Sequence, residues 1–74
     1  MVNRVKKTRI KKGLSQFELS KGSNITQSNL SQIENDKIFP YHGWRERLAL
    51  ALEVEESYLF PDIYKDKNLN EEVK

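Results

Sequence analysis

Residues 15–35 read SQFELSKGSNITQSNLSQIEN, and this segment contains the strongest signals of secondary structure in the chain. Residues 15–18 have the S-x-x-E pattern of a capping box, in which the serine hydroxyl and the glutamate carboxylate bind free N–H groups at a helix start. The helix that begins there is expected to run to about Lys21, because Gly22 and Asn24 favour a turn and accept left-handed backbone angles. We therefore expect a short helix followed by a tight turn.

A second helix follows this turn and begins at Thr26, a residue type whose hydroxyl accepts a hydrogen bond from a free N–H group at a helix start. From residue 27 to residue 35 the only apolar side chains are Leu30 and Ile33, which lie one turn apart. Successive residues turn by about 100° around a helix, so the face opposite this narrow apolar edge is polar and uncharged, with Asn29 at its border. The residues of this outward face are Gln27, Ser28, Ser31 and Gln32.

The residues before this stretch predict one more helix. Val2, Val5 and Ile10 fall within one broad apolar stripe at helical spacing. The segment closes with Gly13, a residue typical of a helix C-terminus. We therefore expect an amphipathic helix that ends just before Gly13.

The residues after the stretch predict two further helices. Residues 36–43 contain a proline and a glycine and indicate a loop. A longer helix follows, with Leu50 nearly opposite its apolar face and therefore exposed, and a last short helix over residues 55–60 is stopped by Pro61. No segment alternates like a strand, so the expected fold class is all-α. The expected core is formed by Leu19, Ile25, Leu30, Ile33, Trp44, Leu48, Leu52, Val54 and Leu59, with Ala51 on the same face as Trp44.

The composition excludes several classes of function. The chain has 74 residues, enough for one small domain, and no cysteine, which removes disulfides and thiol chemistry. Its single histidine, His42, has no second metal ligand at a useful spacing, and there is no glycine-rich phosphate loop. We therefore expect no enzyme activity, no metal and no cofactor. Because the chain leaves no room for a separate ligand-sensing domain, no small-molecule ligand is expected either.

Charge is distributed unevenly along the chain. The first 21 residues hold seven basic residues and one acidic residue, a net charge of +6, whereas residues 44–62 hold two basic and five acidic residues, a net charge of −3. Such a dipole orients toward a polyanion. The alternative is that the lysines and arginines only solvate helix surfaces.

No membrane association is expected. The longest apolar run, residues 48–52, is far shorter than the ~20 residues that span a bilayer, and the basic N-terminus has no apolar segment of a signal peptide behind it. The expected location is a reducing cytoplasm.

Two short helices joined by a tight turn are the elements of a helix-turn-helix, whose second helix enters the major groove of DNA. Over about residues 3 to 60 the chain resembles the Cro/repressor-type (XRE) family of helix-turn-helix domains, and it is most similar to the DNA-binding domains of lambdoid phage repressors and Cro proteins. The likeness is carried by Arg9, Gly13–Gln16, Glu18, Leu19, Ile25–Ser28, Leu30–Asn35, Pro40, Leu48, Ala49, Leu52, Val54, Leu59 and Phe60. The resemblance implies a five-helix, lambda-repressor-like domain that binds double-stranded DNA as a homodimer on a palindromic operator and acts as a transcriptional repressor.

Four residues of the second helix are candidates for contact with base edges. The amide of Gln27 is able to pair with the N6 and N7 edge of adenine. By the resemblance, Ser28, Asn29 and Gln32 meet base edges too. The alternative is an ordinary solvated helix face.

The resemblance places four further residues against phosphates. Gln16 lies at the start of the first helix of the motif, where free N–H groups also favour an anion. In the family, residues at the positions of Arg9 and Glu34 often form an ion pair that lets the arginine touch the DNA backbone. Asn35 and Lys37 follow the second helix and reach phosphates on its far side. The alternative for Gln16 is a plain residue of the capping turn, and the alternative for Lys37 is a surface charge without a DNA contact.

The chain departs from the family pattern around the turn. The family usually has a small alanine at the position of Ser20, an apolar residue at that of Ser23 and a glycine at that of Asn24. This departure predicts a shorter or looser first helix of the motif.

We expect residues 1–62 to form the DNA-binding domain and residues 63–74 to form a polar C-terminal tail. The competing class of function is a protein-interaction module, such as an antitoxin-like helix-turn-helix partner, which the exposed Leu50 and the acidic C-terminal helices favour.

Overall fold

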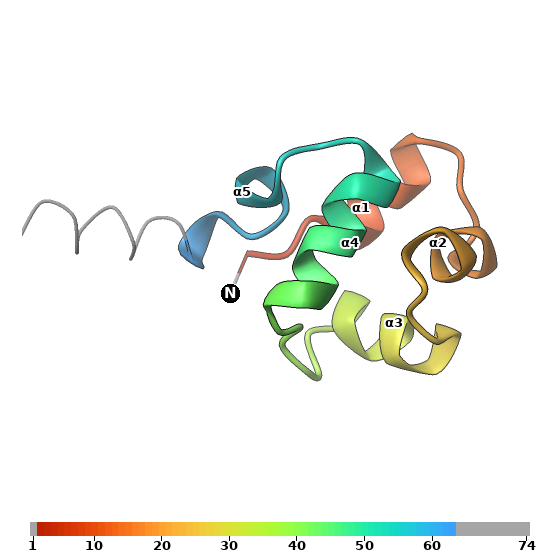
Figure 1. Cartoon of the computed structure of the whole chain (residues 1–74), viewed down its shortest axis with the longest axis horizontal. Helices are drawn as coiled ribbons and strands as arrows, with labels where there is room; N and C mark the ends of the chain where they lie inside the picture. The colour runs from red at the N-terminus through yellow and green to blue at the C-terminus, as the bar shows by residue number, and fades with distance from the viewer. Residues whose placement is uncertain (1, 64–74) are drawn as a thin grey trace, which may run out of the picture.

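The computed structural model describes residues 2–63, and within this range the fold is all-helical. Figure 1 shows α4 beside α1, with α2 and α3 on one side and α5 on the other. A separate helical turn at residues 61–63 follows α5, so the expected count of five helices omits one turn. The helices are α1 (Val5–Lys11), α2 (Gln16–Ser23), α3 (Gln27–Glu34), α4 (His42–Leu52) and α5 (Glu56–Leu59). Each helix among the described residues is too short or too polar to cross a lipid bilayer.

The predicted signals at the start of α2 and α3 are confirmed. The Ser15 hydroxyl accepts a hydrogen bond from the Glu18 N–H at 3.0 Å, and the Glu18 carboxylate accepts one from the Ser15 N–H at 2.7 Å. Thr26 caps α3 by accepting from the Asn29 N–H at 3.2 Å. Asn24 takes the left-handed conformation with φ 58°, which lets the chain turn sharply between the two helices.

The prediction that α2 ends at about Lys21 was wrong. The helix continues to Ser23, which is almost completely buried and whose hydroxyl donates to the Leu19 carbonyl at 2.7 Å. Ser20 likewise donates its hydroxyl to the Ile25 carbonyl. These two serines therefore satisfy their polar groups within the motif, and the departure from the family pattern does not shorten α2.

The apolar stripe predicted for α1 was wrong in part. Val5 is buried, but Ile10 is 58% exposed and Val2, which precedes the helix, is 41% exposed. Five residues of helix turn by about 500°, so Ile10 lies about 140° away from Val5. Thr8 instead joins Val5 on the buried face. The predicted glycine cap is confirmed, since Gly13 has φ 75°.

The core lies between all five helices, with α2 packed against both α4 and α3. Seven of the predicted core residues are buried, namely Leu19, Ile25, Leu30, Ile33, Leu48, Leu52 and Leu59. Trp44 and Val54 are only partly buried and pack against this core, as does Ile63 from the predicted tail. Tyr64 and the rest of that tail lie outside the described residues. Phe60 and Ala49 were not predicted as core but are buried, and Leu50 is 78% exposed as predicted.

The loop after α3 is shorter than predicted, because α4 begins at His42 and includes Gly43. Arg45 fixes this loop: its Nη1 donates to the Pro40 carbonyl at 2.9 Å, and its Nε donates to Glu56 at 2.7 Å. Phe39 also meets the ring of Phe60 edge-on, at a centroid distance of 6.0 Å. The loop is therefore held against the body of the domain by contacts to α4 and α5.

Candidate nucleic-acid interface

The outer face of α3 is the surface that the sequence predicts to meet DNA. Gln27 and Ser28 are exposed, while Asn29 and Gln32 are half-buried. On the opposite side, Leu30 and Ile33 are completely buried. The structure therefore places all four predicted base-contacting residues off the buried edge of α3, the helix that lies at the lower side of the domain in Figure 1.

A buried ion pair anchors the C-terminal end of α3 to α1. Arg9 Nε lies 2.7 Å from Glu34 Oε2, and Arg9 Nη2 donates to Glu34 Oε1 at 3.2 Å. The Glu34 side chain is 2% exposed and that of Arg9 is 12% exposed. Arg9 Nη1 also donates to the Leu14 carbonyl at 2.9 Å, so the guanidinium links α1, the following turn and α3. The family-type ion pair is therefore present.

Gln16 belongs to the same network. Its Nε2 donates to Glu34 Oε1 at 3.2 Å, so in the free protein the side chain contacts α3. An amide NH₂ group carries two hydrogens, and this bond uses one of them. Gln16, Arg9 and Glu34 thus form a polar cluster that joins the start of α2 to the end of α3.

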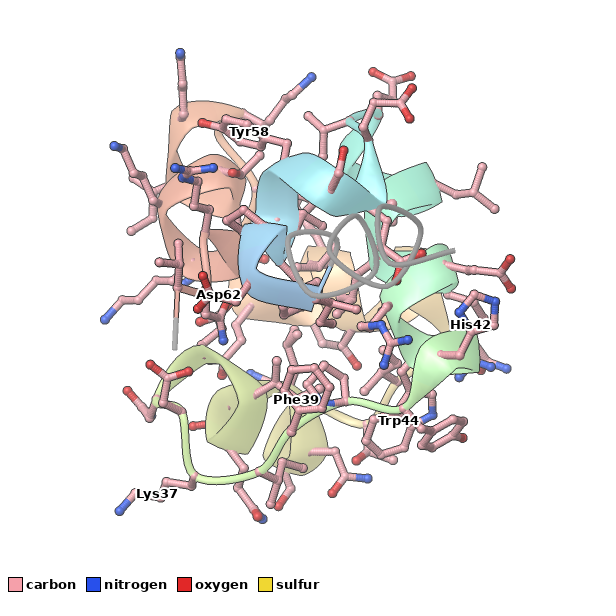
Figure 2. All side chains as sticks on the ribbon, turned by 90° about the vertical axis from the view of Figure 1, so that its left-hand side faces the viewer. Lys37, Phe39, His42, Trp44, Tyr58 and Asp62 are labelled. Atoms are coloured by element: carbon pink, nitrogen blue, oxygen red, sulfur yellow. The ribbon has the colours of Figure 1, made fainter. Side chains whose placement is uncertain are left out.

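Asn35 and Lys37, the two residues after α3 that are predicted to contact phosphates, are both exposed. The Asn35 side-chain NH₂ donates to the Ser31 carbonyl at 2.9 Å and so closes the end of the helix. Figure 2 shows Lys37 at the lower edge of the domain, with its side chain pointing away from the body. Its backbone N–H donates to the Gln32 carbonyl at 2.8 Å, which fixes the base of the side chain beside α3.

Two long-range contacts that hold α3 in place were not predicted. Arg47 of α4 donates from Nε to the Ser23 carbonyl at 2.8 Å and from Nη2 to the Asn24 carbonyl at 3.2 Å, and so fixes the turn. Asn3 donates to the Ile33 carbonyl at 2.6 Å. Neither contact has a signal in the sequence, because each joins residues more than 20 positions apart.

Charge on α3 itself is nearly absent. Its only charged residue is Glu34, whose carboxylate is paired with Arg9. The four lysines Lys6, Lys7, Lys11 and Lys12 are exposed on and just after α1. The outer face of α3 therefore offers hydrogen-bonding groups without net charge, and the positive charge lies mainly on α1.

Among residues 2–63, no three histidine, aspartate or glutamate side chains come together as a group that could bind a metal ion. His42 is exposed, and its Nε2 lies 3.3 Å from the carboxylate of Glu46 one turn along α4. This pair is a surface contact at the start of α4.

The comparison with known families agrees with this geometry. The chain matches the helix-turn-helix domain family over residues 2–64, and it belongs to that family. The search of curated proteins and the search of solved structures found no match. The chain is therefore a helix-turn-helix DNA-binding domain, in which α2 and α3 form the motif. This family typically serves DNA-binding regulation and not catalysis.

Proposed function

We propose that this protein is a sequence-specific regulator of transcription that places α3, with its cap residue Asn35, in the major groove of double-stranded DNA. One observation carries the proposal: α3 turns a face of uncharged hydrogen-bonding side chains outward while buried contacts fix its other side. A rigid helix with amide and hydroxyl groups outward suits the donor and acceptor pattern of the major groove.

In this proposal, the base edges are read by Gln27, Ser28, Asn29 and Gln32. Gln27 and Ser28 are at the N-terminal end of α3, the part of a recognition helix that contacts bases in helix-turn-helix complexes. A glutamine amide pairs with adenine through two hydrogen bonds, whereas a serine hydroxyl contacts several bases without strong preference. Gln27 is therefore the main determinant of sequence preference.

Phosphate contacts are assigned to Arg9, Gln16, Asn35 and Lys37. Gln16 and Arg9 are already joined to Glu34, so each contributes only the hydrogens that this cluster leaves free. Lys37 is exposed beside the end of α3 and reaches the DNA backbone as a point charge. The lysines of α1 add long-range attraction.

We further propose a repressor of the Cro/repressor (XRE) kind, with a lambda-repressor-like domain in residues 1–62 and a polar tail in residues 63–74, of which Ile63 packs back against the core. Two copies would set their α3 helices into successive major grooves, about one helical turn of DNA apart, and so block a promoter. The support is the sequence resemblance together with membership in the helix-turn-helix domain family.

Selection of bound sequences from a pool of random DNA duplexes tests this function. We expect enrichment of a palindrome whose half-sites lie about 10 base pairs apart. Recovery of unenriched sequences, with only weak and salt-sensitive binding, would contradict a sequence-specific regulator.

Replacing Gln27 with alanine is expected to weaken binding to the selected duplex by about 1–3 kcal/mol and to leave binding to random DNA nearly unchanged. The reason is that a lost bidentate contact affects only the sequence that it reads. Titration of the wild type and the variant on both duplexes measures the difference. Equal losses on both duplexes would show that Gln27 does not read bases.

Replacing Lys37 with alanine is expected to weaken binding to both duplexes alike. Because one phosphate contact releases about one counterion, the slope of log K against log salt should become shallower by about 0.9 for each protomer. Titrations at several salt concentrations measure this slope, and Gln27→Ala, which removes no charge, is the matched control. An unchanged slope would place Lys37 away from the DNA.

One observation favours a second candidate function, a protein-interaction module. Leu50 is 78% exposed, and it lines a surface groove with Glu46, Glu55 and Glu56. An apolar side chain among carboxylates fits a protein partner and repels DNA. If the purified protein fails to bind duplex DNA at low salt, this surface becomes the first place to search for its partner.

A further inference from the structure

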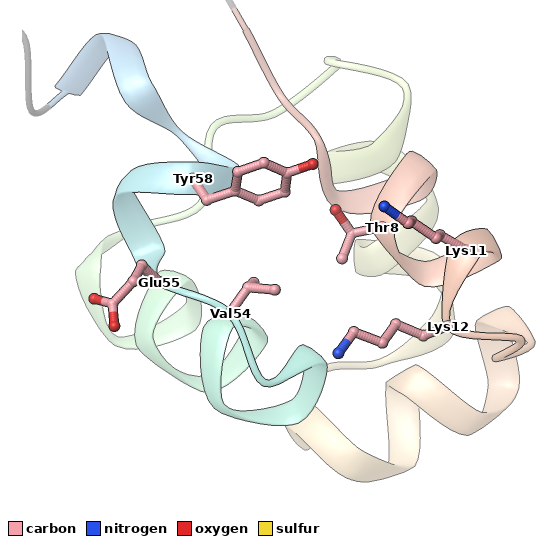
Figure 3. Close-up of a pocket in the computed structure, with 6 residues that line it drawn as sticks. All are labelled: Thr8, Lys11, Lys12, Val54, Glu55 and Tyr58. Atoms are coloured by element: carbon pink, nitrogen blue, oxygen red, sulfur yellow. The ribbon is translucent and has the colours of Figure 1, made fainter.

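A pocket of about 610 Å³ opens between α1 and the segment that joins α4 to α5. Its lining residues are Thr8, Lys11, Lys12, Val54, Glu55 and Tyr58, as Figure 3 shows. In Figure 1 this segment lies at the upper edge of the domain, whereas α3 lies at the lower edge. The pocket is thus separate from the surface proposed to bind DNA, and its volume falls within the range of small-molecule sites.

Thr8 carries an unused polar group in this pocket. The residue is 4% exposed, and its Oγ1 is buried without a hydrogen-bond partner. Buried hydroxyl groups in proteins are nearly always hydrogen-bonded, because an unpaired one costs stability. In Figure 3 the Thr8 hydroxyl points toward the side of the pocket where the Tyr58 hydroxyl and the Lys11 ammonium also lie. Because Oγ1 has almost no accessible surface in the free protein, a ligand with a hydrogen-bonding group at this end would satisfy Thr8 after a small movement of the surrounding side chains.

The charges of the lining favour an anion. Lys11 and Lys12 supply two positive charges and Glu55 one negative charge, which leaves a net charge of +1. Figure 3 shows both lysine side chains reaching from the α1 side toward the pocket, whereas the Glu55 carboxylate points away from its centre. Counted over the whole lining, including the outward-facing Glu55 carboxylate, the net charge of +1 favours a monoanion over a dianion.

The opposite side of the pocket is apolar. Val54 packs against the core, and the ring of Tyr58 forms one wall. Arg4 holds Tyr58 in place, since its Nη1 donates to the Tyr58 carbonyl at 2.8 Å and its guanidinium lies 4.9 Å from the ring centroid. The wall is therefore fixed before any ligand arrives, which favours an apolar ligand body.

We propose that this pocket binds a small amphipathic monocarboxylate, with its carboxylate against Lys11, Thr8 and Tyr58 and its apolar body against Val54 and the Tyr58 ring. This revises the expectation that the protein takes no small-molecule ligand. The proposal concerns the free protein, so its outcome does not depend on whether α3 reads DNA.

Titration of the isotopically labelled full chain with 2-naphthoate, followed by amide chemical shifts in NMR, tests the proposal. We expect saturable shifts around Thr8, Lys11 and Tyr58, with a dissociation constant below about 1 mM. The neutral analogue 2-naphthylmethanol should bind at least about tenfold more weakly, because it lacks the charge that the lysines meet. Tighter binding of 2-naphthyl phosphate than of 2-naphthoate would contradict the monocarboxylate class.

Three variants locate the site. Lys11→Gln and Thr8→Val should each weaken 2-naphthoate binding by about fivefold or more, whereas Lys7→Gln, an exposed lysine of α1 outside the pocket, should change it less than about twofold. Thr8→Val should also keep or raise the melting temperature, since it removes an unpaired buried hydroxyl. The absence of saturable shifts, or equal affinity in Lys11→Gln and the wild type, would overturn the proposal.

Discussion

Replacing Glu34 with alanine is expected to lower the free energy of unfolding by about 3–5 kcal/mol, because it leaves the guanidinium of Arg9 buried without its counter-charge. Glu34 is 2% exposed and accepts hydrogen bonds from both Arg9 and Gln16. A domain of this size has a stability of about 5 kcal/mol, so the variant would be close to unfolding at room temperature. Urea unfolding followed by circular dichroism measures the loss.

Two controls separate the buried pair from a general effect of lost charge. Glu46→Ala removes a carboxylate that is 58% exposed and should cost less than about 0.5 kcal/mol. The double variant Arg9→Met/Glu34→Leu removes both charges and should be more stable than Glu34→Ala, because no unpaired charge stays buried. If Glu34→Ala is as stable as Glu46→Ala, the pair does not anchor α3.

The same substitution should also weaken DNA binding by those protein molecules that stay folded. Without Glu34, neither Arg9 nor Gln16 is held against the end of α3, so both proposed phosphate contacts lose their position. Titration at a temperature where the variant is folded tests this effect.

Replacing Phe60 with alanine is expected to cost about 3–5 kcal/mol, since a completely buried ring would leave a cavity in the core. Phe60 also meets the edge of Phe39, which lies in the loop between α3 and α4. The cavity should therefore loosen this loop as well. Thermal or urea unfolding measures the stability, and hydrogen exchange of the loop amides measures the loosening.

The matched control for this core substitution is Phe17→Ala. The Phe17 ring is 57% exposed and contacts Lys21, whose Nζ lies 5.3 Å from the ring centroid. Its removal should cost less than about 1 kcal/mol. A similar loss for the two phenylalanines would contradict the assignment of Phe60 to the core.

The parts of the fold that depend only on residues close together in the sequence could be predicted from it. The capping box at Ser15 and Glu18, the cap at Thr26 and the left-handed Asn24 are all local, and each has a strong residue preference. The spacing of Leu30 and Ile33 likewise fixes which side of α3 is buried. The direction of the candidate recognition face follows from these local signals alone.

The contacts that hold α3 at a given angle could not be predicted from such patterns. Arg47 to Ser23 and Asn3 to Ile33 join distant residues, and any exposed arginine or asparagine has many possible acceptors. The burial of Phe60 was also missed, because a position after a short helix has no periodic neighbours that show its direction. The Arg9–Glu34 pair was foreseen only through the family resemblance.

The central claim is that the outer face of α3 reads base sequence, and the most direct test is the ratio of affinities for the selected duplex and for a scrambled duplex of equal length and composition. The wild type should prefer the selected duplex by a factor of about 10³ or more at physiological salt. The double variant Gln27→Ala/Gln32→Ala should lose most of this preference and keep its affinity for the scrambled duplex. A wild-type ratio near one, or a full ratio in the double variant, would contradict the claim.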